Sequence, residues 1–493
     1  MTDTICTTDT LIIGSGISGV GAAIRMLDKG MSDFVILEKF EDIGGTWRDN
    51  TYPGCECDVP SALYSYSFEP NPRWSQVFAG QKEIFDYVKA TAEKYNVIPK
   101  IRFGVEVHKG QWNEEESLWH VKTSKGLYKA RKVVSCVGYL HEPIIPDLPG
   151  LSDFEGEVFH SARWRHDLDL TGKRVAVIGT GASAIQFVPK IQPQAKELYV
   201  FQRSPQWLLP KINLRIPAFA QKLLSVKPVH SAFRAMLYGG MELFGVGFRH
   251  PWIMRQIQRL GKFHIKRQIK DPELQKKVTP NYILGCKRVL LSNSYYPALA
   301  QDNVDVMATG VKEIRGNTVV GENGEQCEVD VIIFGTGFYV SDIPVADKIT
   351  GASGLTLADI WKGSPEAYLG TTCHDFPNCF VILGPNLAIG HNSAFIIIEA
   401  QLNYVIGALE EMRRRNVDRL EVNAKAQREY NQRVQRDLKG TVWNTGGCTS
   451  YYLDVNGKNS VGFPWSTLKL KELLQHFDTQ SYKLSKTSDD GAK

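Results

Sequence analysis

The stretch VAVIGTGASAIQF, at residues 175–187, decides the fold class of this chain. Its apolar beginning predicts a buried strand, and the residues that follow have the G-x-G-x-x-A spacing of a tight turn that opens into a helix. An equivalent stretch, LIIGSGISGVGAA, occupies residues 11–23. Two strand–turn–helix units of one kind predict an α/β fold with two Rossmann-like dinucleotide-binding domains.

The first unit has the features of a diphosphate-binding site. Glycine lets the backbone approach a pyrophosphate, and the N-terminus of the following helix supplies free N–H groups and positive partial charge. The next strand, FVILEKF, ends near Glu38, which lies 24 residues after Gly14. A carboxylate there accepts hydrogen bonds from a ribose diol and repels a 2′-phosphate. This site therefore suits FAD or NAD, and the turn residues expected to bind it are Gly14, Gly16, Ser18 and Gly19.

The second unit has the same spacing and the opposite charge. Its second strand, ELYVFQ, ends near Arg203, again 24 residues after the first glycine of the turn. An arginine followed by the hydroxyl of Ser204 favours a 2′-phosphate through charge-assisted hydrogen bonds. The second site is therefore expected to bind NADPH, a hydride donor, through the turn residues Gly179, Thr180, Gly181, Ala182, Ser183 and Ala184.

Two later segments are assigned to the FAD site. VDVIIFGTGF, at residues 329–338, predicts a buried strand ending at Gly335 and Gly337, which let the chain pass close to a cofactor. A strand followed by a simple glycine turn is the alternative. The run HNSAFIIIEAQLNYVIGALEEM predicts a long helix capped by Asn392 or Ser393. The N-terminus of that helix suits the electron-rich pyrimidine edge of a reduced flavin.

Composition and charge exclude several classes of partner. The chain has 493 residues, a net charge of +5 and 43% hydrophobic residues, which describes an ordinary soluble protein without the charge blocks that bind nucleic acid. No apolar run reaches the roughly 20 residues that span a bilayer, and the nearest, at residues 235–248, contains Glu242. No signal segment precedes the first turn. We expect a cytoplasmic protein of unknown oligomeric state.

The nine cysteines are scattered and predict reduced thiols instead of a disulfide framework. Cys55 and Cys57 form the only close pair. Because no second pair or histidine cluster accompanies them, we interpret both as structural residues and predict no metal site.

Two further segments identify a family. GGTWRDNTYPGCECD, at residues 44–58, and FEGEVFHSARW, at residues 154–164, resemble the signatures of the type I Baeyer-Villiger monooxygenases. The likeness extends from about residue 10 to about residue 475 and includes GCKRVLLSNSYYPAL and GGCTSYYLDVNGKN. One departure is Arg165, because the family pattern continues after the tryptophan with Pro or Asp.

The resemblance implies a reaction and its residues. In the family, NADPH reduces FAD, O2 gives a C4a-peroxyflavin, and that peroxide attacks a ketone to give an ester or lactone. Arg288 matches the family's catalytic arginine and Asp58 the carboxylate that positions it, while Lys287 matches the lysine that joins Arg203 on the 2′-phosphate. By composition alone, Lys287 and Arg288 would be interpreted as a solvated surface pair. Trp47 and Tyr64 are expected to contact the flavin. Val107 and Gly337 are expected to bind a cofactor.

His160, in the second signature, is expected to connect the domains and not to act as a base. By its length and its GPNLAIGHNS segment, the chain resembles the members that accept linear or bulky apolar ketones. Two alternatives stay open: a monooxygenase that oxygenates sulfur or nitrogen, for which Arg165 gives some room, and a non-catalytic protein that senses NADPH.

The expected domain division follows from these assignments: residues 1–145 and 329–482 for FAD, residues 146–215 and 281–328 for NADP, residues 216–280 as a helical insertion, and residues 483–493 as a disordered tail. Within the insertion, residues 249–270 carry seven Lys or Arg and no acid, with Ile253, Ile257 and Leu260 on one stripe. This helix could lie on an anionic membrane surface. We favour a helix that packs the stripe on the core and keeps a solvated basic face.

Overall fold

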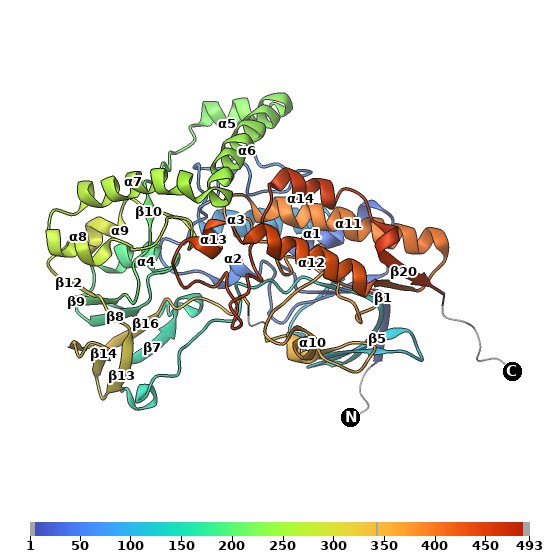
Figure 1. The fold of residues 1–493 in the computed structure, drawn as a ribbon, viewed down its shortest axis with the longest axis horizontal. Helices are drawn as coiled ribbons and strands as arrows, with labels where there is room; N and C mark the ends of the chain where they lie inside the picture. The colour runs from blue at the N-terminus through green and yellow to red at the C-terminus, as the bar shows by residue number, and fades with distance from the viewer. Residues whose placement is uncertain (1–4, 342–343, 487–493) are drawn as a thin grey trace.

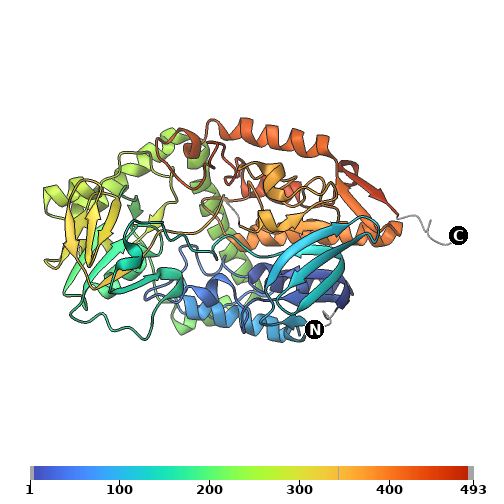
Figure 2. The same cartoon turned by 90° about the horizontal axis from the view of Figure 1, so that it is seen from below.

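The computed structural model describes residues 5–341 and 344–486, and this part of the chain forms two lobes, each built around one β-sheet. Figure 1 shows the lobes side by side beneath a layer of helices, and Figure 2 shows the two sheets from below. We call the lobe that contains β1 the first lobe and the lobe that contains β8 the second lobe. The predicted α/β architecture with two Rossmann-like units is confirmed.

The sheet of the first lobe has eight strands in the order β17-β4-β5-β6-β1-β2-β3, with β18 paired to β6. β1 leads into the first glycine turn and pairs in parallel with both β2 and β6, so its carboxyl end lies in the middle of the sheet. The strands are β1 (Ile5–Ile13), β2 (Phe34–Leu37), β3 (Ile101–Arg102), β4 (Val107–Asn113), β5 (Leu118–Thr123), β6 (Gly126–Ser135), β17 (Ile349–Thr350) and β18 (Cys379–Val381).

Helices cover the first lobe. The long helix α11 packs against α1, which follows the first glycine turn. Ser393 caps α11 by accepting a hydrogen bond from the backbone N–H of Phe395, so the second of the two predicted caps is the one used. The helices are α1 (Ile17–Asp28), α2 (Thr46–Asp49), α3 (Gln81–Lys94), α10 (Leu357–Trp361), α11 (Ala394–Arg415), α12 (Ala424–Leu438), α13 (Val442–Thr445) and α14 (Thr467–Leu473).

The sheet of the second lobe has the order β12-β9-β8-β16-β7, and every pairing in it is parallel. A small antiparallel sheet, β13-β14-β15, lies beside it. The elements are β7 (Glu157–His160), β8 (Arg174–Ile178), α4 (Ala184–Ile191), β9 (Glu197–Phe201), α9 (Tyr295–Leu299), β12 (Val304–Met307), β13 (Val311–Arg315), β14 (Thr318–Gly321), β15 (Gln326–Glu328) and β16 (Val331–Phe334).

The predicted boundary before residue 329 is wrong. β16 was assigned to the FAD domain, but it pairs with β8 and β7 in the second lobe, in the register Val331↔Val175 and Val331↔Glu157. An all-apolar strand buried on both faces suits the centre of either parallel sheet. Its residue pattern therefore does not say which sheet it joins, and the chain returns to the first lobe only after Phe334.

The region predicted as a helical insertion is helical. It contains α5 (Ala218–Leu224), α6 (Lys227–Arg249), α7 (Pro251–Gln268) and α8 (Pro272–Val278). The short strands β10 (Leu208–Leu209) and β11 (Leu290–Leu291) pair in parallel on either side of it in the sequence. α5 and α6 rise above the rest of the molecule in Figure 1, and α7 runs along the top of the second lobe. Within the described residues, no helix is both long and apolar enough to cross a bilayer.

The C-terminal tail begins later than predicted. Lys483 to Ser485 belong to β20 (Tyr482–Ser485), which pairs in an antiparallel manner with β19 (Arg419–Val422). The apolar residues Leu420 and Leu484 lie opposite each other in this two-stranded ribbon. The prediction missed the strand because most residues of the tail are polar. The remaining part of the predicted tail, residues 487–493, lies outside the described residues.

Candidate active site

The first glycine turn is closed by backbone against backbone. Gly14 has a φ of +98°, and a Cβ on it would lie 2.7 Å from the carbonyl oxygen of Cys136, just after β6. A Cβ on Gly19 would lie 1.9 Å from the oxygen of Gly14. Neither position accepts a side chain. No side chain caps the N-terminus of α1 at Gly16, and Ser18 is buried in its first turn. The turn therefore offers backbone N–H groups of the kind that bind a diphosphate.

Glu38 faces this turn, as the spacing predicted. The residue is 5% exposed, and its carboxylate accepts hydrogen bonds from the backbone N–H of Ser15 at 3.0 Å and from the Ser15 hydroxyl at 2.7 Å. Its second oxygen accepts from Arg48 at 2.9 Å. These contacts fix the carboxylate beside the glycines of the turn.

Trp47 and Tyr64 lie together next to the first turn. A Cβ on Gly45, two residues before Trp47, would lie 3.3 Å from the Cα of Gly16. The indole of Trp47 donates to the hydroxyl of Tyr64 at 3.1 Å, and the ring of Tyr64 meets that of Phe395 edge-on at 5.0 Å. Burial raises the pKa of Tyr64 well above its usual value. The N-terminus of α11 therefore reaches the same place as the first turn.

The second turn repeats the construction of the first. A Cβ on Gly179, whose φ is +108°, would lie 2.5 Å from the oxygen of Gly335, which follows β16. Gly181 and Ser183 are half-buried and Ala182 is exposed, while Thr180 and Ala184 are buried, with Ala184 beginning α4. No side chain caps α4. At this turn too, the backbone N–H groups at the start of a helix have no side-chain cap.

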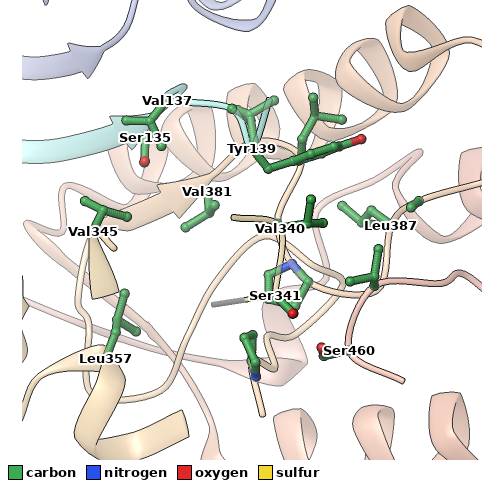
Figure 3. A pocket seen from close by; sticks show the side chains of 18 of the residues that line it. Ser135, Val137, Tyr139, Val340, Ser341, Val345, Leu357, Val381, Leu387 and Ser460 are labelled. Atoms are coloured by element: carbon green, nitrogen blue, oxygen red, sulfur yellow. The ribbon is translucent and has the colours of Figure 1, made fainter. Parts of the chain in front are cut away.

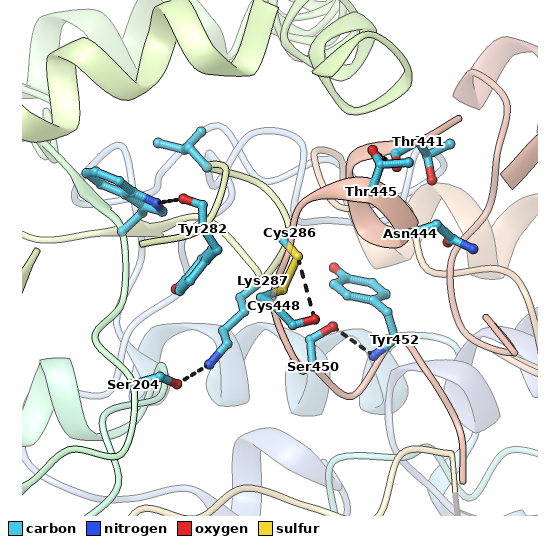
Figure 4. Close-up of a disulfide and its surroundings, with 12 residues drawn as sticks. Ser204, Tyr282, Cys286, Lys287, Thr441, Asn444, Thr445, Cys448, Ser450 and Tyr452 are labelled. Carbon is cyan, nitrogen blue, oxygen red and sulfur yellow. Dashed lines mark hydrogen bonds between the residues drawn. A yellow bond between two sulfur atoms is a disulfide. The ribbon is translucent and has the colours of Figure 1, made fainter. Parts of the chain in front are cut away.

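Three predicted phosphate-binding residues come together beside the second turn. Lys287 donates a hydrogen bond to the hydroxyl of Ser204, a contact drawn in Figure 4. Burial, and then the nearby charge of Arg203, lowers the pKa of Lys287. Arg203 itself is exposed. Two cations that repel each other and flank a hydroxyl form a site that a phosphate group stabilises.

Arg288 and Asp58 form the ion pair that the resemblance implied. The guanidinium donates from Nε to Oδ2 at 3.1 Å and from Nη2 to Oδ1 at 2.6 Å, which is a two-point contact. The Asp58 side chain is 18% exposed and that of Arg288 is 44% exposed. Burial alone would raise the pKa of Asp58, but Arg288 outweighs it and holds that pKa below its usual value. Asp58 in turn raises the pKa of Arg288, so both groups are charged at neutral pH.

The signature at residues 44–58 connects the two turns. Its beginning lies against Gly16, as described above, and its end packs on α4 of the second lobe. The hydroxyl of Tyr52 donates to the side chain of Gln186 on α4 at 3.0 Å, and Gln186 donates to the backbone oxygen of Glu56 at 2.9 Å. Asp58 therefore follows a segment that is fixed to both nucleotide turns.

Lys211 is a residue that the sequence reasoning missed. Its side chain is 6% exposed, contacts the Glu56 carboxylate at 2.7 Å and donates to the backbone oxygen of Cys57 at 3.2 Å. Its charge also lowers the pKa of Asp58, after the effects of burial and Arg288. The available signal was weak, because a single lysine after the strand-like run WLLP resembles any surface residue.

Tyr139, Tyr451 and Tyr452 are further residues near the ion pair. Tyr451 and Tyr452 interact electrostatically with Arg288, and their rings stack at 4.6 Å. Burial raises the pKa of Tyr139, which also interacts with Tyr451 and Arg288. Tyr451 and Tyr452 lie in the run GGCTSYYLDVNGKN, which only the family resemblance singled out, and nothing in the sequence alone linked them to Arg288.

Tyr139 lines an apolar pocket in the first lobe (Figure 3). The pocket lies at the carboxyl ends of β6 and β18, which pair as Val381↔Ser135. The carboxyl ends of parallel strands are where α/β sheets bind ligands. Its described lining is apolar or bears hydroxyl groups and includes Ser135, Val137, Tyr139, Val340, Ser341, Val345, Leu357, Val381, Leu387 and Ser460.

A disulfide joins two loops of the site, which corrects the prediction of nine reduced thiols. Cys286, directly before Lys287, is bonded to Cys448 (Figure 4). The two cysteines are 162 residues apart, so their spacing in the sequence gave no sign of the pairing. Cys55 and Cys57 are free, and burial raises the pKa of the Cys57 thiol to about 12. Among the described residues, no group of three His, Cys, Asp or Glu side chains is arranged to hold a metal ion.

The two notable residues of the second signature lie apart from the ion pair. His160 is 2% exposed and accepts a hydrogen bond from the backbone N–H of Ala162 at 3.1 Å. Its ring meets Phe338 edge-on at 5.7 Å, so it contacts the segment in which the chain returns to the first lobe. Arg165 is on the surface and pairs with Glu157 at 3.0 Å and Asp167 at 2.7 Å.

Among the described contacts, none joins Gly337 or Val107 to the residues of the two glycine turns, so the structure does not place either of them in a cofactor site. Gly337 has a φ of +86° and accepts a hydrogen bond from the backbone N–H of Ile144 at 2.9 Å. Val107 is half-buried at the start of β4 and packs in an apolar cluster with Leu11. Their assignment to cofactor binding stays a prediction.

Comparisons with known proteins agree with this geometry. The model of the flavin-binding monooxygenase-like family matches residues 8–350. A protein of Pseudomonas aeruginosa named Baeyer-Villiger monooxygenase is 48% identical over 480 residues, which cover 97% of this chain and 91% of the relative. One of Streptomyces coelicolor with the same name is 46% identical over 479 residues, covering 96% and 92%.

Among solved structures, cyclohexanone monooxygenase from Rhodococcus sp. Phi1 bound to NADP+ superposes with a TM-score of 0.88 at 27% identity, over 98% of this chain and 100% of that chain. The likeness therefore includes both lobes and the insertion. The chain belongs to the flavin-binding monooxygenase-like family and, within it, to the Baeyer-Villiger monooxygenases.

Proposed function

We propose that this protein is an NADPH- and O2-dependent FAD monooxygenase that converts apolar ketones to esters or lactones. The observation that carries the proposal is the Asp58–Arg288 ion pair, which follows a segment fixed to both glycine turns. A guanidinium held at this place can stabilise negative charge that develops on a reacting oxygen.

The first turn fits FAD. Its glycines leave no room for a side chain, as the contacts of Gly14 and Gly19 show, so a pyrophosphate can approach the backbone. Glu38 would hold the ribose, and Trp47 and Tyr64 would lie beside the ring system. Bound FAD would supply the hydride-accepting and O2-activating chemistry that no side chain of the protein provides.

The second turn fits NADPH. Arg203, Ser204 and Lys287 offer two positive charges and a hydroxyl to a 2′-phosphate, whereas the first turn offers the carboxylate of Glu38. The opposite charges at equivalent positions keep the two dinucleotides in separate sites.

Asp58 and Arg288 carry the protein's part in oxygen transfer. Arg288 would hold its positive charge near the carbonyl oxygen, which becomes an oxyanion when the carbonyl carbon is attacked. Asp58 fixes the direction of the guanidinium through two hydrogen bonds. Because Arg288 is 44% exposed and still fixed, it can contact a ligand without first moving away from its partner.

The lining of the pocket supports the proposed substrate class. Beside Tyr139 the pocket offers apolar and hydroxyl-bearing side chains, which suit an uncharged chain or ring. Linear or bulky apolar ketones are therefore the proposed substrates, with O2 as the second.

A ketone series tests the proposal. The purified protein, reconstituted with FAD, is reduced anaerobically with NADPH and then mixed with air and one ketone of increasing chain length, and the products are measured by mass spectrometry. We expect NADPH-dependent ester formation. Conversion of sulfides or amines without any ester, or binding of NADPH without its consumption in the presence of any substrate, would contradict the proposal.

Arg165 was the reason to consider that the protein oxygenates sulfur or nitrogen instead of ketones. Since Arg165 pairs with Glu157 and Asp167 on the surface, this departure from the family pattern does not alter the surroundings of Arg288. No other described contact favours sulfur or nitrogen over a carbonyl group.

A further inference from the structure

The helical insertion exposes large apolar side chains. Leu223 on α5 is 55% exposed, Leu243 on α6 is 75% exposed, and Phe219, Trp252 and Phe263 are 76%, 65% and 59% exposed. We call the exposed apolar and basic side chains of the insertion, residues 216–280, the insertion face. Scattered exposed hydrophobic residues are normal, but a concentration of them on neighbouring helices marks an interaction surface.

The packing of α7 onto the core does not account for this exposure. The predicted core stripe is wrong in part, because Leu260 is 47% exposed and Ile253 only half-buried. The stripe that packs inward consists of Met254, Gly261, His264 and Ile265. A Cβ on Gly261 would lie 2.9 Å from the ring of Trp207, which shows how closely that side of α7 is packed. The helix therefore has an apolar side toward the core and further apolar residues toward solvent.

On α7 the outward apolar residues are grouped. At about 100° per residue, Trp252, Phe263 and Leu260 fall within a sector of roughly 80°, which they share with the exposed side chains of Gln256 and Arg267. The neighbouring sector carries basic residues, and all of the following are exposed: Arg255, Arg259, Lys262 and Lys266. Large apolar side chains beside a row of Lys and Arg are typical of a helix that lies in a membrane–water interface.

On α6 the exposed stripe carries no charge. It consists of Ala232, Ala235, Met236, Gly239, Gly240 and Leu243. Glu242, also on α6, points away from this stripe and contacts His391 at 3.3 Å. Figure 1 shows α5 and α6 projecting beyond the rest of the molecule, so a flat surface can reach them.

The charge of the insertion differs from that of the rest of the chain. Residues 216–280 contain 12 Lys or Arg and three acids, whereas the whole chain contains 58 and 53, which leaves 46 and 50 elsewhere. The insertion is thus strongly positive and the remaining molecule slightly negative. A second copy of the insertion would be repelled by like charge, and an anionic lipid surface would be attracted.

We propose that the insertion face docks the protein onto an anionic lipid membrane. The apolar side chains of α5, α6 and α7 would enter the interface, and the flanking Lys and Arg would contact lipid phosphates. This proposal concerns binding alone and does not depend on the reaction that the protein catalyses. Apolar ketones partition into lipid, so docking would also bring the protein to them.

Vesicle sedimentation with the FAD-loaded full chain tests the proposal. We expect the protein to sediment with vesicles of phosphatidylcholine and phosphatidylglycerol, not with phosphatidylcholine alone, and to be released by high salt. The variant R259E/K262E/K266E should lower the apparent affinity at least tenfold, because each basic residue near the surface contributes about 1 kcal/mol. The variant W252S/F263S should weaken binding at low salt as well.

The matched control is K425E/R428E/K439E, which makes the same change of charge at exposed positions on and just after α12. This control should sediment as the unchanged protein does. Retained NADPH oxidation in all variants shows that they are folded. Equal sedimentation of all variants would overturn the proposal, as would no binding to anionic vesicles. A dimer seen by light scattering for the unchanged protein but not for W252S/F263S would also overturn it. The insertion face would then bind a second copy of this chain.

Discussion

Lys287 and Arg288 are neighbours in the sequence but contact different partners. Lys287 contacts Ser204 beside Arg203, and Arg288 contacts Asp58. Because the two neighbouring side chains contact partners in different units, one short segment joins both halves of the site. The sequence alone favoured a solvated pair, because charged residues are mostly exposed. Only the resemblance to a family singled them out, and Lys211 had no such motif to mark it.

Arg203 is expected to determine the choice between the two nicotinamide cofactors. In Arg203→Ala, the KM for NADPH should rise about 10- to 100-fold, because hydrogen bonds to a charged group each contribute about 1.5–3 kcal/mol. The KM for NADH should change little. Steady-state kinetics with both cofactors measures this, with Arg165→Ala as a control at an exposed arginine. An equal loss for NADPH and NADH would contradict the assignment of the 2′-phosphate site.

His160 is expected to make stability depend on pH. Burial, and then Arg163, lowers its pKa to about 4, while an unfolded histidine titrates near 6.5. The unfolded state therefore binds more protons between these values, and stability falls as pH drops through this window. Between pH 7 and pH 5 the loss should be about 2 kcal/mol.

Urea unfolding at pH 7 and pH 5 measures the effect of His160. His160→Gln can still accept a hydrogen bond from Ala162 and should lose about 2 kcal/mol less than the unchanged protein over this interval. His108→Gln, at a histidine whose side chain is 55% exposed, is the control and should behave as the unchanged protein does. The same pH dependence in His160→Gln would show that another group is responsible.

At the scale of elements, the glycine turns and the strands that enter them were predictable, and β16 was not. The turn, its strand and its helix are adjacent in the sequence, so local spacing defines them. β8 contains the apolar run VAVI, the beginning of the quoted stretch, which the sequence predicted as a buried strand. The pairing of β16 is set by contacts with segments far from it in the sequence, and its residues VIIF suit the centre of either sheet. For the same reason the 162-residue separation hid the pairing of Cys286 with Cys448.

The Cys286–Cys448 disulfide is expected to stabilise the connection between the Lys287–Arg288 segment and the loop that bears Tyr451. Closing a long loop restricts the unfolded chain, so Cys448→Ser should lower the free energy of unfolding by about 2–4 kcal/mol. Thiol titration of the denatured, unreduced protein should find the seven free cysteines. Dithiothreitol should lower the melting temperature of the unchanged protein and of Cys6→Ser, but not of Cys448→Ser. Nine titratable thiols in the unchanged protein would contradict the pairing.

At the scale of the whole molecule, the site is an assembly of segments that cross between two lobes. Residues 44–58 contact both turns, His160 meets the returning segment at Phe338, and Glu242 of the insertion contacts His391 near α11. The opposite charges of Glu38 and Arg203, which would lie at the two ribose positions, could be derived from the sequence. Each residue belongs to the same strand–turn–helix–strand unit as the turn that it accompanies. The place of Arg288 could not be derived, because it depends on contacts between units.

Product formation by Arg288→Ala, measured beside its rate of FAD reduction, tests the central claim most directly. With NADPH and a ketone that the unchanged protein converts, we predict that reduction of FAD continues while ester formation falls by at least about 100-fold, the loss expected when one group that stabilises an oxyanion is removed. Arg165→Ala should retain both rates. Ester formation by Arg288→Ala at the rate of the unchanged protein would contradict the account.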